Sequence, residues 1–145
     1  MTENELERAK RYGSAFSLVM LSIDDFASIK ASYGPRASDK LLQTLAKTVR
    51  RQIRPLDLFA RFGDAEFVML QPQSKADDAL LAANRIREII AQTPVLAGSE
   101  VLEFTVCVGV TTCNDPKRGL EPLFHRLKEA LLDAQELGSD RLVVR

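Results

Sequence analysis

The order of predicted elements in this 145-residue chain predicts an α+β sandwich, with a mainly antiparallel five-stranded sheet packed by helices. Residues 15–23 are apolar almost without interruption, as expected of a central strand covered on both faces. Three long segments carry apolar side chains at helical spacing, and two short apolar runs joined by a tight turn predict a β-hairpin. At this length we expect a single domain over residues 1–145.

Each element has its own signal. A polar helical segment is expected over residues 1–12, ahead of the first strand. The predicted strands share short apolar runs bounded by turn residues, and cover residues 15–23, 58–62, 66–71, 101–111 and 141–144. The predicted helices share an apolar stripe: a short one begins at Asp24 and is broken at Gly34-Pro35, and longer ones cover residues 36–53, 75–92 and 120–134.

Composition narrows the possible functions. The 20 basic and 20 acidic residues give zero net charge, so we expect no general attraction to DNA, RNA or an anionic membrane, and any phosphate site must be local. No apolar run approaches the length of a membrane span. Cys107 and Cys113 lack metal-ligand spacing, and Cys107 is expected to be a buried thiol. These features favour a cytoplasmic setting.

The hairpin tip is the most informative stretch. It reads Gly63-Asp64-Ala65-Glu66-Phe67, and it resembles the Gly-Gly-(Asp/Glu)-Glu-Phe hairpin of the GGDEF family, the diguanylate cyclases of bacterial cyclic di-GMP signalling. The resemblance extends over about residues 6–145 and implies a ferredoxin-like core similar to nucleotidyl cyclase domains. In that family the second Gly leaves room for a GTP phosphate, where Asp64 adds bulk and negative charge. The third position supplies a carboxylate to two metal ions, which Ala65 cannot do.

Other positions that the resemblance assigns to the active site also differ. Ser22 stands where the family has a metal-binding Asp, and a hydroxyl is a poor Mg²⁺ ligand compared with a carboxylate. Ala27 replaces a phosphate-binding Lys, and Lys30 replaces the Asn that reads guanine. Asp39 matches the remaining guanine-binding Asp.

Near the C-terminus, Gln135 and Ser139 replace two basic residues that contact the triphosphate in the family. Because phosphoryl transfer depends on positioning and charge neutralisation, we expect no diguanylate cyclase activity and no Mg²⁺ at the degenerate site. Four carboxylates could rebuild a metal site in another geometry: Asp24, Asp25, Asp64 and Glu66. The simpler interpretation is that Asp24 caps the following helix and Asp64 serves a turn.

A second family site keeps its residues. Many members carry Arg-x-x-Asp five residues before the hairpin motif, where it binds the product cyclic di-GMP, and this chain has Arg54-Pro55-Leu56-Asp57 at that spacing. Counting along the chain places Arg85 at the position of a further arginine of this site. An arginine fork suits the guanine O6 and N7 acceptors, and Asp57 suits the N1 and N2 donors. Each residue also has a structural alternative: Arg54 at a helix dipole, Asp57 in a turn, and Arg85 solvated.

Three functions follow. The first is a catalytically inactive GGDEF domain that acts as a cyclic di-GMP receptor. The second is an interaction scaffold that binds no nucleotide and pairs with itself or an effector protein. The third, ranked last, is residual cyclase activity or GTP binding through Asp39. His125 is expected to be a surface or partly packed imidazole. The phenylalanines are expected to pack in the core: Phe16, Phe26, Phe59, Phe62, Phe67, Phe104 and Phe124.

Overall fold

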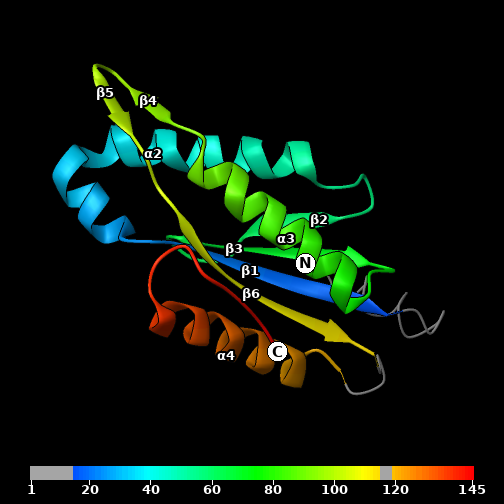
Figure 1. Cartoon of the computed structure of the whole chain (residues 1–145). Helices are drawn as coiled ribbons and strands as arrows, with labels where there is room; N and C mark the ends of the chain where they lie inside the picture. The colour runs from blue at the N-terminus through cyan, green and yellow to red at the C-terminus, as the bar shows by residue number, and fades with distance from the viewer. Residues whose placement is uncertain (1–14, 115–118) are drawn as a thin grey trace.

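The computed structural model describes residues 15–114 and 119–145, so the helical segment expected over residues 1–12 lies outside the described residues. Its centre is a five-stranded sheet in the order β2-β3-β1-β6-β7 (Figure 1). The strands are β1 (Phe16–Ile23), β2 (Leu58–Arg61), β3 (Glu66–Pro72), β6 (Val106–Cys113) and β7 (Leu142–Val144). Only the β6–β7 pair is parallel. The α+β architecture predicted from the sequence is confirmed.

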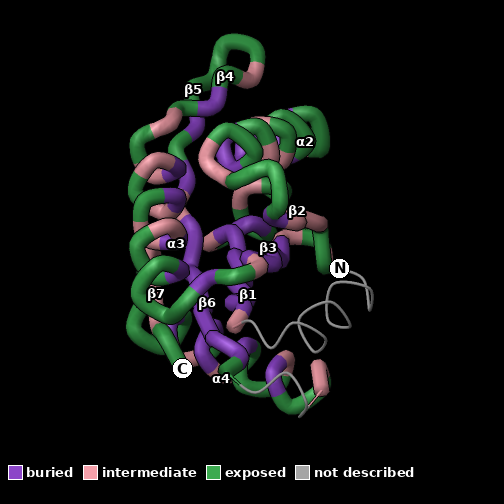
Figure 2. The backbone as a smooth tube through the Cα atoms, turned by 90° about the vertical axis from the view of Figure 1, so that its right-hand side faces the viewer, coloured by how far each residue is buried: buried purple, intermediate pink, exposed green. Residues whose placement is uncertain are grey.

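Helices cover both faces of this sheet. α2 (Phe26–Gln52) and α3 (Ala76–Ala91) lie on one face, and α4 (Glu121–Leu137) lies on the other (Figure 1). Val19 and Leu21 of β1 pack toward α2 and α3, whereas Leu18 and Met20 pack toward α4. Every residue of β1 is buried as a result, which explains its continuous apolar run. Figure 2 shows the buried backbone concentrated in the sheet between the two helical layers.

Two glycines have clear structural reasons. Gly34 has φ +87° and interrupts helical geometry within α2, so the predicted break at Gly34-Pro35 is confirmed even though the two helical pieces run on as one element. Gly109 allows β6 to approach α4 closely, because a Cβ there would lie 2.7 Å from the backbone nitrogen of Leu131.

The predicted strand over residues 101–111 is wrong in its extent. β5 (Glu100–Leu102) belongs to a separate two-stranded sheet with β4 (Val95–Ala97), and residues 103–105 separate it from β6. The turn between β4 and β5 contains Gly98 at φ +63°. The small sheet therefore projects beyond the main one (Figure 1). The apolar residues of β5 and β6 predicted a single strand, because the spacing of apolar residues does not show where a strand changes its pairing partner.

The expected burial of the phenylalanines is also wrong at one position. Phe62 is 51% exposed, because it lies beyond the end of β2 in the hairpin tip. Its ring stacks on Phe124 with a centroid separation of 6.1 Å, and Lys128 Nζ lies 5.6 Å from the Phe62 centroid. Phe62 is therefore a surface contact between the hairpin and α4.

Candidate functional site

The first candidate site lies where β1 ends beside the β2–β3 hairpin tip. Ser22, at the last but one position of β1, is 8% exposed, and its Oγ accepts a 3.3 Å hydrogen bond from Gln135 Nε2 of α4. The family resemblance assigned these two positions to a metal-binding carboxylate and a basic residue on the triphosphate. In this chain the two positions carry neutral side chains that bind each other.

The hairpin tip is closed on itself. Ala65 packs against the apolar core beneath α2 and α3, and its carbonyl accepts a 2.9 Å hydrogen bond from the Ile23 N–H. Glu66 folds back toward Gly63, so that a Cβ at Gly63 would lie 3.0 Å from Glu66 Oε1. The Arg61 guanidinium donates to the carbonyl oxygens of Gly63 and Asp64, and Asp64 itself is exposed. The tip therefore keeps a hairpin shape without directing Ala65 toward a ligand.

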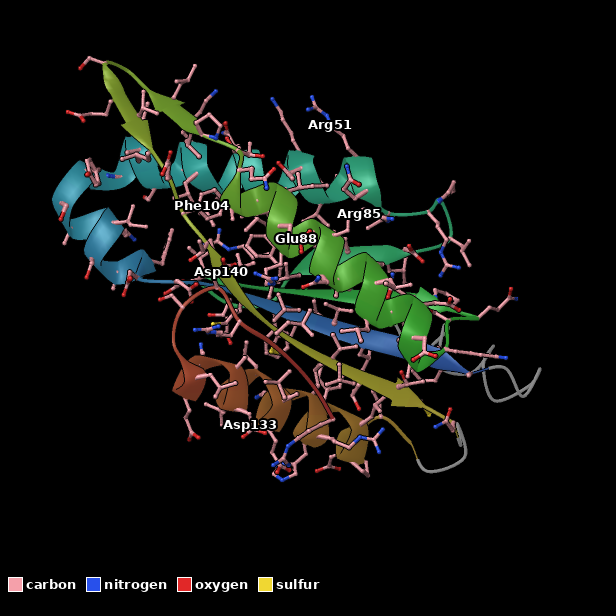
Figure 3. The ribbon with its side chains drawn as sticks, in the orientation of Figure 1. Arg51, Arg85, Glu88, Phe104, Asp133 and Asp140 are labelled. Atoms are coloured by element: carbon pink, nitrogen blue, oxygen red, sulfur yellow. The ribbon has the colours of Figure 1, made fainter. Side chains whose placement is uncertain are left out.

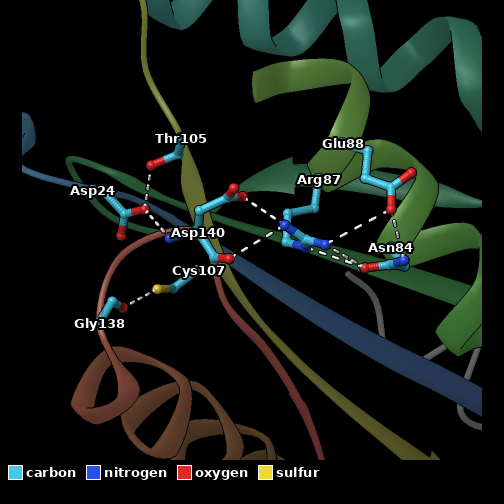
Figure 4. Close-up of polar contacts among 8 residues, drawn as sticks. All are labelled: Asp24, Asn84, Arg87, Glu88, Thr105, Cys107, Gly138 and Asp140. Carbon is cyan, nitrogen blue, oxygen red and sulfur yellow. Dashed lines mark hydrogen bonds and ion pairs between the residues drawn. The ribbon is translucent and has the colours of Figure 1, made fainter. Parts of the chain in front are cut away.

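Asp24 does not cap α2 as predicted. Asp25 occupies the N-cap position at φ 55°, without a side-chain hydrogen bond to the helix. Asp24 Oδ2 instead accepts hydrogen bonds from Thr105 Oγ1 at 2.6 Å and from the backbone N–H of Asp140 at 2.8 Å (Figure 4). Both donors come from distant segments, and they occupy one carboxylate oxygen that a local cap would otherwise use. Asp24 therefore joins three parts of the chain.

An ion pair extends this network to α3. Arg87 Nη1 lies 2.7 Å from Asp140 Oδ1, and the same guanidinium donates to Asn84 Oδ1 (Figure 4). Cys107 lies beside them, and its Sγ donates to the Gly138 carbonyl at 3.2 Å. Burial raises the pKa of the Cys107 thiol to about 11, which keeps it protonated at neutral pH. No local pattern could indicate the Arg87–Asp140 pair, because its partners are 53 residues apart.

Three more positions that the family resemblance assigned to the active site lie on the surface of α2. Ala27, Lys30 and Asp39 are all exposed. Across residues 15–114 and 119–145, no hydrogen bond or ion pair joins Lys30 or Asp39 to another side chain. The structure thus joins Ser22 and Gln135 by a hydrogen bond, while no hydrogen bond among the described residues joins Ala27, Lys30 or Asp39 to that pair.

The second candidate site is the turn between α2 and β2. The Asp57 N–H donates to the Arg54 carbonyl at 3.0 Å, which closes a β-turn with Pro55 at its second position. Arg54 Nε and Nη2 donate to Asp57 Oδ1 at 3.0 and 2.8 Å, and the Arg54 backbone N–H donates to Asp57 Oδ2 at 2.9 Å. The Asp57 side chain is only 1% exposed, whereas that of Arg54 is 43% exposed.

A shallow hollow of about 490 Å³ adjoins this turn. Its lining residues are Arg50, Ile53, Arg54, Pro55, Asp57, Leu58 and Phe59. Arg85, the third predicted site residue, is exposed on α3 and does not line the hollow. Figure 3 shows Arg85 on α3 and Arg51 on the last turn of α2. Within the described ranges no hydrogen bond or ion pair connects Arg85 to Arg54 or Asp57.

Two further searches cover only the described part of the chain. No group of three or more histidine, cysteine, aspartate or glutamate side chains there has a geometry that could hold a metal ion. None of its helices is long and apolar enough to cross a membrane. His125 is 78% exposed and pairs with Glu129 at 3.0 Å, so the expectation of a surface imidazole is confirmed.

The fold and the hairpin define this chain as a domain of the nucleotidyl cyclase type. Residues 1–141 match the family model described as "Diguanylate cyclase, GGDEF domain". The chain is 36% identical over 142 residues to diguanylate cyclase DgcP of Pseudomonas aeruginosa, covering 98% of this chain and 21% of that protein. This chain belongs to the GGDEF family. It spans about a fifth of the length of DgcP, and about a third of other curated relatives.

Solved structures agree with this assignment. Diguanylate cyclase SiaD from Pseudomonas aeruginosa, solved in complex with its activator SiaC, superposes with a TM-score of 0.93 at 32% identity, covering 99% of this chain and 55% of SiaD. The active GGEEF domain of a diguanylate cyclase from Vibrio cholerae gives a TM-score of 0.89 at 26% identity, covering 97% of this chain and 89% of that one. That active domain is named for Gly-Gly-Glu-Glu-Phe, where this chain has Gly-Asp-Ala-Glu-Phe.

Proposed function

We propose that this chain is a catalytically inactive GGDEF domain that acts as a cyclic di-GMP receptor through Arg54, Asp57 and Arg85. The observation that carries the proposal is the preformed turn, in which Arg54 and Asp57 are held together by three hydrogen bonds at the family spacing. The ligand class comes from the family resemblance and from the chemistry of these three side chains.

The proposal of inactivity rests on the donor set at the end of β1. Mg²⁺ binds carboxylates, carbonyl oxygens and phosphates, and it gives up water reluctantly. Ser22 offers one hydroxyl that already accepts from Gln135, and Ala65 offers a methyl group packed on the core. These residues do not fit a two-metal site. Asp24, the residue after β1, has its Oδ2 engaged by Thr105 and Asp140.

The receptor proposal rests on the arginines. Cyclic di-GMP presents two guanines and two phosphates, and an arginine fork can meet the O6 and N7 acceptors of guanine or two oxygens of a phosphate. Arg54 is partly exposed and Arg85 is exposed, so both can reach a ligand. Binding through Asp57 requires the Arg54 fork to exchange its bonds to Asp57 for bonds to the ligand. The β-turn limits the conformational entropy lost in that exchange.

One observation favours a second function, the interaction scaffold that binds no nucleotide. The Asp57 carboxylate is 1% exposed and already fully engaged by Arg54. A turn of this kind can serve the fold alone, by fixing the path from α2 into β2. Partner binding would then use other surfaces, and cyclic di-GMP would have no effect. GTP binding through Asp39 ranks third, since no other side chain in the described ranges bonds to Asp39.

The test is a calorimetric titration of cyclic di-GMP into the purified chain, with GTP as the comparison. We expect a dissociation constant at or below about 1 μM, close to −8 kcal/mol, and no heat from GTP. Arg85→Ala should weaken binding at least tenfold without changing the melting temperature, because Arg85 is exposed. Arg54→Ala should abolish binding.

Arg36→Ala is the matched control, since Arg36 is another exposed arginine, near the middle of α2 and far along the helix from its last turn. It should leave the affinity unchanged. Undiminished affinity in both Arg54→Ala and Arg85→Ala would contradict the site. No heat from cyclic di-GMP would leave the scaffold function. Formation of cyclic di-GMP from GTP and Mg²⁺ would contradict the proposed inactivity.

A further inference from the structure

Two stacked aromatic rings and one guanidinium lie next to one another beside the Arg54 turn. Phe59 of β2 stacks on Phe67 of β3, with centroids 5.4 Å apart and ring planes 7° from parallel. Arg50 Cζ of α2 lies 5.9 Å from the Phe59 centroid, on the ring face. Phe67 is buried, Phe59 is partly buried and Arg50 is exposed, so the three side chains lead from the core to the surface.

The hollow beside the Arg54 turn is lined by positively charged residues, although the chain as a whole has no net charge. Arg50 and Arg54 both line it, and Arg51 follows Arg50 in the last turn of α2. Asp57 is the only acidic residue among the lining residues, and Arg54 already engages it. In the part of the chain that the structure describes, neither Arg50 nor Arg51 forms an ion pair. The hollow therefore suits an anion that also carries a flat ring.

We propose that Arg50 is a further ligand-binding residue of this site, and that a guanine base of cyclic di-GMP stacks on the outer face of its guanidinium. This inference rests on the proposed receptor function. The side of the Arg50 guanidinium toward Phe59 is occupied by the ring, and because Arg50 is exposed its other side remains available to a base. Arg54, in the turn that follows α2 and in the same hollow, would meet the edge of the base or a phosphate.

Arg50 has a purely structural alternative. Cations in the last turn of a helix interact favourably with the helix dipole, and a cation over an aromatic ring adds a modest contact. Arg51 lies in the same last turn of α2 as Arg50. It is neither placed over the Phe59 ring nor among the residues that line the hollow. It is therefore the matched control, because it carries the same charge in the same helical turn without lying over the ring.

The experiment measures cyclic di-GMP affinity by calorimetry for the unmodified chain and for Arg50→Ala, Arg50→Lys and Arg51→Ala, together with each melting temperature. Arg50→Ala should weaken binding about tenfold, in line with the contribution of stacking one base. Arg50→Lys should restore the charge but not the planar face, and should stay at least about fivefold weaker than the unmodified chain. Arg51→Ala should change the affinity less than about threefold.

Each other result overturns the inference in a distinct way. If Arg50→Ala binds cyclic di-GMP as tightly as the unmodified chain does, Arg50 does not bind the ligand, while the proposed receptor function stands. Full recovery in Arg50→Lys shows that only charge matters, and equal losses in Arg50→Ala and Arg51→Ala show a diffuse electrostatic effect. Absence of binding by the unmodified chain removes the receptor function and this inference together.

Discussion

The end of β1 and the turn after α2 contrast in how their polar side chains are used. At the end of β1, the Ser22 hydroxyl accepts a hydrogen bond from Gln135. The Asp24 carboxylate accepts hydrogen bonds from Thr105 and from the Asp140 N–H. At the turn, Asp57 is satisfied by Arg54, yet Arg50, Arg51 and Arg85 remain exposed and unpaired by any described acidic group. In the first region the polar side chains form internal contacts, and in the second the arginines keep charge at the surface.

The two regions differ in what their polar side chains contribute to the fold. Neutral pairs such as Ser22–Gln135 need no ligand to balance charge, so the sheet and α4 pack there without one. A group of exposed arginines gains little for the fold by itself, because surface charges contribute little to stability. Removing side chains should therefore affect stability in the first region, and ligand affinity in the second, apart from the buried Asp57.

Asp57 should give the largest change in stability. Asp57→Ala removes a buried carboxylate that accepts from Arg54 Nε, Nη2 and backbone N–H, and we expect a loss of about 2–4 kcal/mol in the free energy of unfolding. Urea denaturation measures it. Asp64→Ala, the same change at an exposed position of the hairpin tip, should stay within about 0.5 kcal/mol. Equal effects in the two variants would contradict the structural role of Asp57.

Asp24 should give the next largest change. Asp24→Ala removes the acceptor for Thr105 Oγ1 and for the Asp140 N–H, and we expect a loss of about 1–3 kcal/mol with cyclic di-GMP affinity unchanged. Thr105→Val removes one of the two donors while keeping the side-chain shape, so it should cost less. Weaker ligand binding in Asp24→Ala would show that the two regions are coupled and not independent.

Sequence patterns predicted the parts of this molecule that depend on local order. The continuous apolar run identified β1 as a central strand, because both faces of that strand are covered. The Arg54–Asp57 turn was also predictable in outline, since Pro55 favours a turn and its hydrogen bonds span only three residues. The three longer expected helical segments are long enough for their apolar stripes to be clear.

Contacts between distant segments could not be predicted in the same way. Asp24 had a plausible local use as a helix cap, yet its donors lie 81 and 116 residues away. The small β4–β5 sheet was missed for a related reason: Val101 and Leu102 continue the apolar run toward β6 but pair with β4 instead. Phe62 looked like a core residue by type, and only the position of the hairpin tip beside α4 places it at the surface.

Ser22→Asp and Gln135→Lys introduce, at the end of β1, the charged residues that the family resemblance implies at these two positions. Ser22→Asp places a carboxylate at a position that is 8% exposed, and we expect a loss of about 1–3 kcal/mol in stability, because burial penalises the charge. Gln135→Lys alone should cost less, since its position on α4 is exposed to solvent. The double variant places the two opposite charges where Gln135 Nε2 and Ser22 Oγ now lie 3.3 Å apart.

A double-mutant cycle by urea denaturation isolates that pair. The double variant should be more stable than the sum of the single changes by about 1 kcal/mol, within the range found for residues in contact. Glu136→Gln, which raises the net charge by the same one unit at the adjacent exposed position of α4, should show no coupling to Ser22→Asp beyond about 0.5 kcal/mol. Zero coupling for Gln135→Lys would mean that Ser22 and Gln135 are merely adjacent, and that charges at these two positions do not support one another in this fold. A clear coupling would show that neutral residues now fill a geometry that still accepts a charged pair.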